Sequence, residues 1–101
     1  MAVHRVAPAR DLLGRVRVRI PTPLRSYTAQ ESVVEGRGAT VDEVLRDLDE
    51  RYPGMRFRMV DEQNNVRKHM KIWVNEDACR DLSTPVSDAD EITIMQALSG
   101  G

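Results

Sequence analysis

The chain has 101 residues, 41% of them hydrophobic and 4% aromatic, which fits one globular domain with a modest core and argues against a large aromatic-lined cofactor pocket. Its formal net charge of −1 excludes the strongly basic surface through which proteins bind nucleic acids or anionic membranes. No apolar run approaches the roughly 20 residues of a transmembrane helix, and no secretory signal is recognisable, so we expect a cytoplasmic protein.

Residues that could ligate a metal are few and scattered. The two histidines, His4 and His69, lie far apart in the sequence, and Cys79 is the single cysteine. We therefore expect no metal site, no internal disulfide and an ordinary reduced thiol at Cys79. A role of Cys79 in relaying sulfur is the less favoured alternative, because only Arg80 lies close enough in sequence to stabilise a thiolate.

The first half of the chain predicts two strands after an N-terminal arm. Residues 1–14 have no clear period and are expected to be flexible. Residues 15–20 then alternate between arginine and an aliphatic residue, which is typical of a half-buried strand, and two prolines end this pattern. A short second strand is predicted at residues 31–35, followed by a turn at 36–38.

The clearest predicted element is a helix over residues 41–52. Thr40 precedes Glu43 by three residues, which is the spacing of a capping box, and a Pro-Gly pair follows the helix. Apolar residues recur at helical spacing on one face, at Val41, Val44, Leu45, Leu48 and Tyr52.

The second half of the chain predicts three more strands. Residues 55–59 alternate, with Met55, Phe57 and Met59 on one side, and another strand is predicted within residues 70–78, with a turn at 75–77. The closing strand is predicted at residues 91–95. Because the first and last strands alternate most cleanly, we expect both in the middle of one sheet that packs around the helix.

Four stretches in this order carry a resemblance to a known family: VRIPTPLR, ATVDEVLRDLDERYPG, KIWVNEDACR and SDADEITIMQALSGG. With the final Gly-Gly, the chain resembles the ubiquitin-like β-grasp sulfur carriers of the MoaD/ThiS family, and within it the bacterial CysO-type carriers of cysteine biosynthesis. The resemblance implies an α+β fold, a ubiquitin-like β-grasp with a mixed sheet of four to five strands around one main helix. The domain would span residues 15–95, between the arm 1–14 and a flexible Gly-Gly tail, 96–101.

The resemblance also implies a chemistry centred on the C-terminal carboxylate of Gly101. An ATP-dependent ubiquitin-activating-like enzyme would adenylate it, and a sulfur donor would convert it to a thiocarboxylate. The tail would then deliver sulfur to a biosynthetic partner such as a cysteine synthase-like enzyme, and a metal-dependent peptidase is a further candidate partner. Gly100 would give access to narrow active sites, and the tether would consist of Ala97, Leu98 and Ser99. The protein itself would be a co-substrate rather than an enzyme, with no bound cofactor, since the partner uses the ATP.

Three side chains outside the tail are candidates for binding the activating partner. Arg17 and Arg19 project away from the core, and they would lie near Glu91 if the first and last strands are neighbours. The alternative is a solvated sheet face with weak cross-strand pairs. Trp73 faces outward if its two neighbours point inward, so it would either anchor an interface or pack beneath a loop or the N-terminal arm.

Other functions for such a tail remain open at this point. The small subunit of molybdopterin synthase would insert the tail into a larger subunit, and a ubiquitin-like modifier would join it to lysines. A plain β-grasp binding module would leave the two glycines without a role.

Overall fold

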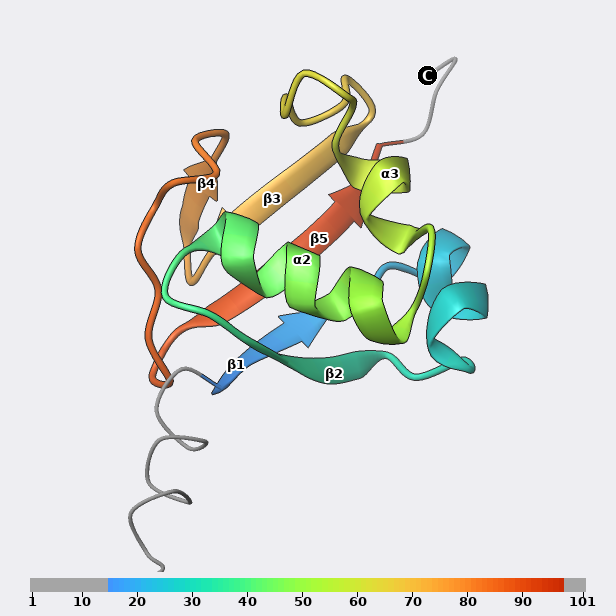
Figure 1. The fold of residues 1–101 in the computed structure, drawn as a ribbon, viewed down its shortest axis with the longest axis horizontal. Coiled ribbons are helices and arrows are strands. Elements are labelled where there is room, and N and C mark those ends of the chain that lie inside the picture. The colour runs from blue at the N-terminus through green and yellow to red at the C-terminus, as the bar shows by residue number, and fades with distance from the viewer. Residues whose placement is uncertain (1–14, 98–101) are drawn as a thin grey trace, which may run out of the picture.

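The structure, a computed structural model, describes residues 15–97, so the predicted arm 1–14 and residues 98–101 lie outside the described residues. Its centre is one mixed sheet with the strand order β2-β1-β5-β3-β4 (Figure 1). The parallel pair is β1 with β5, and the other neighbours run antiparallel. The strands are β1 (Arg15–Arg19), β2 (Val33–Arg37), β3 (Met70–Val74), β4 (Asp77–Cys79) and β5 (Glu91–Gln96).

The first and last strands occupy the interior of the sheet, as the sequence predicts. β5 is the central strand and β1 lies beside it, with Val18 opposite Ile92. Val16, Val18, Ile92 and Ile94 are buried on the face that packs on the helices. β1 pairs with the first three residues of β5, and β3 pairs with β5 from Ile92 to Gln96, so the end of β5 is held by β3.

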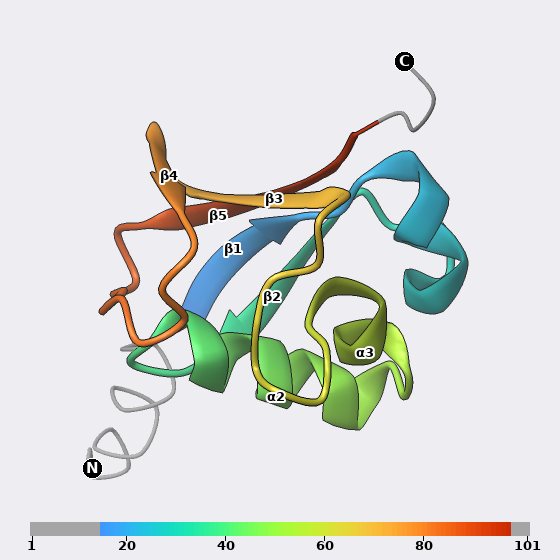
Figure 2. The same ribbon diagram turned by 90° about the horizontal axis from the view of Figure 1, so that it is seen from above.

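The predicted main helix is present as α2 (Val41–Arg51), one residue shorter than predicted, and it packs with α3 on one face of the sheet (Figure 2). The predicted cap at Thr40 forms, because the backbone N–H of Glu43 donates to Thr40 Oγ1 at 3.2 Å. The reciprocal bond of the capping box is shifted by one residue, since Glu43 Oε1 accepts from the N–H of Ala39 at 2.8 Å rather than from that of Thr40. A Cβ on Gly38 would lie 2.7 Å from the backbone nitrogen of Val44, so the chain can enter the helix this closely only with glycine.

The strand predicted at residues 55–59 is wrong, because these residues form the helix α3 (Met55–Met59). Met55 and Met59 are fully buried, whereas the side chain of Phe57 is 55% exposed. Residues four positions apart lie on the same face in a helix as well as in a strand, so the spacing of the two methionines is compatible with either structure. Phe57, at the middle position, lies on the opposite side in the helix.

Smaller differences concern the edges of the sheet. The second strand runs over Val33–Arg37, so Gly36 lies inside a strand rather than in a turn, and its missing Cβ makes room for Val44 of α2. β4, with three residues, was not predicted as a separate strand. The connection after β1 contains a 3-10 helix, η2 (Thr22–Thr28).

Candidate functional site

The backbone that leads to the tail is fixed as far as Ala97. The N–H of Asn75 donates to the carbonyl of Glu91 at 2.7 Å at one end of the β3–β5 ladder. At the other end, the N–H of Ala97 donates to the carbonyl of His69, also at 2.7 Å. Gln96 and Ala97, assigned to the tail from sequence, thus continue the pairing with β3. The other predicted tail residues lie outside the described residues: Leu98, Ser99, Gly100 and Gly101.

The beginning of β5 is held by a side-chain network. The amide of Asn75 donates to Asp90 Oδ1 at 2.8 Å and accepts from the backbone N–H of Glu91 at 3.0 Å. Asn75 has a positive φ of 56°, a conformation that asparagine tolerates well. The amide of Asn75 and then the backbone N–H of Ser87 hold the pKa of Asp90 below its ordinary value of 3.8. The strand that carries the tail is therefore anchored at both ends.

The structure brings the three predicted partner-binding side chains onto one face of the sheet. Register places Arg17 beside Glu91, and Arg19 beside Thr93, which in turn faces Trp73 on β3. The predicted proximity of the basic row to Glu91 is confirmed, since Arg19 Nε lies 3.0 Å from Glu91 Oε2. Within the described part of the chain no helix or strand covers this face, which we call the outer face (Figure 2).

Trp73 lies on the outer face as a half-buried side chain. Its strand neighbours at that level are Thr93 on one side and Ala78 on the other. The indole Nε1 is shielded from solvent and has no hydrogen-bond partner among residues 15–97. Met95, also on β5, is 50% exposed and extends the apolar part of this face toward Ala97. An N–H that is shielded from solvent and lacks an acceptor costs free energy relative to the same group in water.

A second feature, which we call the exit pocket, lies where the chain leaves β5 and was not predicted from sequence. It has a volume of about 350 Å³ and is lined by Phe57, Arg58, Arg67, His69, Met70 and Gln96. The guanidinium of Arg67 stacks over the ring of Phe57 at 4.4 Å from its centroid, and its Nε donates to the Phe57 carbonyl at 2.7 Å. Only a helical interpretation of residues 55–59 would have placed Phe57 and Arg58 together at this surface.

An ion-pair network fixes α3, and with it the exit pocket, against α2. Asp42 accepts from Arg46 at 2.7 Å and from Arg56 at 2.9 Å, and Arg56 also donates to Asn64 in the loop before β3. Burial acts to raise the pKa of Asp42, but the hydrogen bonds and charges of Arg46 and Arg56 outweigh it and lower the pKa. This cluster supports the fold rather than forming a site of its own.

Cys79 is a free, buried thiol. Its Sγ lies 3.3 Å from the carbonyl of Asp81 and 3.4 Å from Thr84 Oγ1. Among residues 15–97 no group of three or more histidine, cysteine, aspartate or glutamate side chains could hold a metal ion. In the same part of the chain, no helix has the length and apolar character needed to cross a membrane.

The fold and the sequence match one family over most of the chain. The model of the ThiS family matches residues 18–101, which includes the whole of the described sheet except the first residues of β1. The chain belongs to the ThiS family. It is 35% identical over 91 residues to the sulfur carrier protein CysO of Mycobacterium tuberculosis, covering 85% of this chain and 98% of the relative.

Solved structures agree with this assignment. The CysO structure from the BexX/CysO complex of Amycolatopsis orientalis superimposes with a TM-score of 0.78 at 37% identity, covering 85% of this chain and 99% of that one. The small archaeal modifier protein 1 of Methanosarcina acetivorans gives a TM-score of 0.73 at 26% identity, with 88% and 98% covered. The predicted β-grasp fold is confirmed. This ThiS-family chain is a sulfur carrier of the CysO type, and so a protein co-substrate rather than an enzyme.

Proposed function

We propose that the carboxylate of Gly101 is the group that carries sulfur. A carboxylate is a poor electrophile, so a partner enzyme joins it to the AMP part of ATP and releases pyrophosphate. Sulfide-level sulfur from a donor then attacks the acyl-adenylate at its carbonyl carbon and expels AMP, which leaves a thiocarboxylate. The match of the ThiS family model through Gly101 is the observation that carries this proposal.

The position of the tail suits this chemistry. Four residues follow Ala97 in the sequence, and such a segment reaches about 14 Å at most when fully extended. Gly100 and Gly101 have no side chains to obstruct a narrow channel or shield the carbonyl. Ala97, Leu98 and Ser99 form the tether. The globular body must dock on the partner, because a short tether alone cannot position the reacting carbonyl.

The outer face is the proposed docking surface for the activating enzyme. Arg17 and Arg19 supply positive charge, and Trp73 supplies a large side chain of the kind that often anchors interfaces. Support comes from their common face and from the orphaned Nε1 of Trp73, which a partner could satisfy. ATP is consumed by the partner and no cofactor is needed on the carrier. Because activation uses ATP and a reduced sulfur donor, the proposal places the protein in the cytoplasm.

The proposed acceptor is a cysteine synthase-like enzyme, with cysteine or a related sulfur-containing metabolite as the product. The similarity to CysO of Mycobacterium tuberculosis over nearly the whole relative supports this choice. If the cargo stays attached to Gly101 after transfer, a metal-dependent peptidase would be the class of enzyme that releases it.

Mass spectrometry of the C-terminal peptide tests the proposal, after incubation with host lysate, ATP and sulfide. Replacement of oxygen by sulfur changes the mass almost as much as oxidation of one of the five methionines, so fragmentation must place the gain on Gly101. A Cys79→Ala variant removes the competing thiol. We expect a gain at Gly101 that needs ATP and disappears when Gly101 is deleted. An unmodified Gly101, in a lysate that activates another carrier, would refute the proposal.

Protein modification is the second candidate function. The similarity to the small archaeal modifier protein 1 of Methanosarcina acetivorans is the observation that favours it. In that case the activated Gly101 would form isopeptide bonds with lysines of other proteins. Conjugates of higher mass that carry an epitope-tagged chain, and that vanish on deletion of Gly101, would identify this function.

A further inference from the structure

The exit pocket has no role in the proposed docking through the outer face. Its lining residues come from α3, from the loop that leads into β3 and from the ends of β3 and β5. These segments meet at the end of the molecule where β5 ends (Figure 1). Its lining includes Met70 and Gln96, the residues that pair at the last step of the β3–β5 ladder. Whatever takes up the tail must therefore approach this pocket.

The two arginines of the exit pocket have no acidic partner in the described part of the chain. Neither Arg58 nor Arg67 forms an ion pair with any residue in the range 15–97. The ion pairs of that range join other arginines to acids, at Arg15–Glu35, Arg19–Glu91, Arg46–Asp42, Arg51–Asp47 and Arg56–Asp42. Lys68, next to Arg67, is also exposed and has no ion pair in the described part. Two arginines and a lysine without ion pairs thus lie beside the exit of the tail.

The pocket is also held in a defined shape. The guanidinium of Arg67 contacts both the carbonyl and the ring of Phe57, so it is already ordered before a ligand binds. Binding therefore costs less side-chain entropy at this residue. Phe57 is 55% exposed, and both aromatic side chains and arginine are enriched at protein–protein interfaces.

We infer that the exit pocket is a second docking surface, which receives an acidic rim around the tail channel of the ATP-dependent activating enzyme. This inference rests on the proposed function. With Gly101 four residues beyond Ala97, the reacting carbonyl lies at most about 14 Å from the anchored backbone. A partner whose active site lies below its surface must close onto the carrier around the exit. Arg58 and Arg67 then meet carboxylates on that rim, and Phe57 packs between them.

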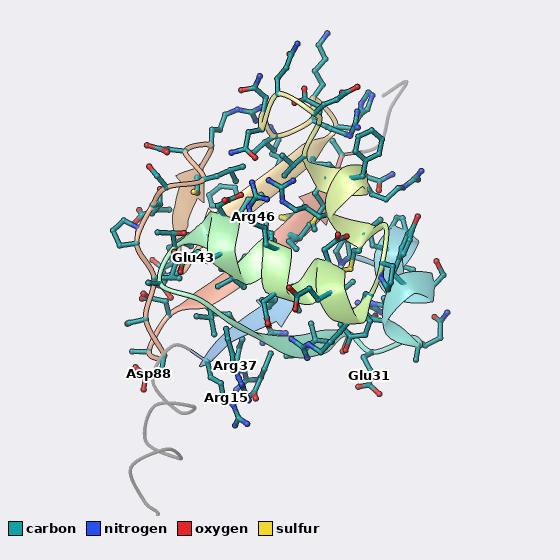
Figure 3. All side chains as sticks on the ribbon, in the orientation of Figure 1. Arg15, Glu31, Arg37, Glu43, Arg46 and Asp88 are labelled. Carbon is teal, nitrogen blue, oxygen red and sulfur yellow. The ribbon has the colours of Figure 1, made fainter. Side chains whose placement is uncertain are left out.

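The test measures ATP–pyrophosphate exchange by the purified activating enzyme of the host at increasing concentrations of the carrier. In the Arg58→Glu variant we expect the KM for the carrier to rise about tenfold at low salt, and the kcat to stay within about twofold. The rise shrinks as salt is added, because exposed charges are screened. The matched control is Arg46→Glu, which makes the same charge change on α2, away from the exit pocket and the outer face (Figure 3), and leaves Asp42 its ion pair with Arg56. This control should leave KM within about twofold.

A second variant, Phe57→Ala, tests the apolar part of the proposed contact separately from its charge. Phe57→Ala should also raise KM, but by a factor that depends little on salt, since it removes apolar contact. All variants are first shown by urea unfolding to be folded under the assay conditions. Equal KM values for the unaltered chain and both exit-pocket variants would overturn the inference while leaving the proposed function intact.

Three other outcomes also decide the question. A lower KM for Arg58→Glu would mean that Arg58 holds the chain's own tail in the pocket and that the substitution frees the tail for the enzyme. This result would contradict docking of the enzyme at the pocket. A loss of kcat with unchanged KM would mean that the pocket acts on the chemical step, which contradicts it as well. If the unaltered chain supports no exchange with an enzyme that activates another carrier, the proposed function fails and this inference fails with it.

Discussion

Replacement of Met59 and of Phe57 by alanine should have clearly different effects on stability. Met59 is fully buried between the helices and the sheet, and truncation of a buried methionine costs about 2–5 kcal/mol. Phe57 is 55% exposed, so burial of the remaining surface contributes about 1 kcal/mol. Its contact with Arg67 adds roughly 0.5–1 kcal/mol, and the higher helix propensity of alanine returns about 0.5 kcal/mol. The expected net cost for Phe57→Ala is therefore about 1 kcal/mol.

Urea unfolding followed by circular dichroism measures both changes. With an m-value of about 1.5 kcal/mol per molar urea, the midpoint should fall by more than about 1.3 M for Met59→Ala and by about 0.7 M for Phe57→Ala. The m-value itself should stay constant. A strand at residues 55–59 would instead place Phe57 and Met59 on the same face. If Phe57→Ala destabilised the protein as much as Met59→Ala does, the helix α3 and the exposed Phe57 would both be refuted.

Three further predictions concern local contacts. Gly38→Ala should destabilise the protein more than Gly36→Ala. The Cβ added at Gly38 would meet the backbone of Glu43 and Val44, whereas the Cβ added at Gly36 would first meet the side chain of Val44. Thermal unfolding of both variants measures the difference, and the reverse order would contradict this reasoning. Thr40→Ala should cost about 1 kcal/mol through loss of the helix cap, whereas Thr40→Ser should cost only a few tenths, and equal losses in urea unfolding would argue against the cap. The pKa of Asp90 is lower in the folded state, so this carboxylate stabilises the protein above its ordinary pKa near 4, and the stabilisation is lost as the pH falls further. Between about pH 5 and 2 the free energy of unfolding should therefore drop less in Asp90→Asn than in the unaltered chain. Parallel plots of this free energy against pH for the two proteins would contradict the lowered pKa.

The elements that local sequence dictates were predicted correctly. The helix α2 follows from the cap at Thr40 and from apolar residues at helical spacing, all of which lie within the element itself. The alternation in β1 and β5 likewise fixes which side chains face the core. Because these two strands are neighbours, the same alternation places Arg19 beside Glu91 on the outer face.

The features that depend on distant contacts could not be predicted in the same way. Residues 55–59 carry a pattern that a strand and a short helix share, and packing against α2 decides between them. β4 has only three residues and is defined by its pairing with β3, in which Ala78 lies opposite Trp73. The exit pocket requires that Arg67, ten residues along the chain, folds back onto the carbonyl and ring of Phe57.

Two surfaces flank the end of the strand that carries the tail. The outer face lies on one side of the sheet, and the exit pocket, which includes Gln96 at the end of β5, lies on the side of α3. A partner that docks on both surfaces, as we propose, contacts the carrier on both sides of this strand. Docking on two sides of a fixed strand restricts the direction of the tail as well as its reach, and direction is what a short glycine-rich segment cannot provide by itself.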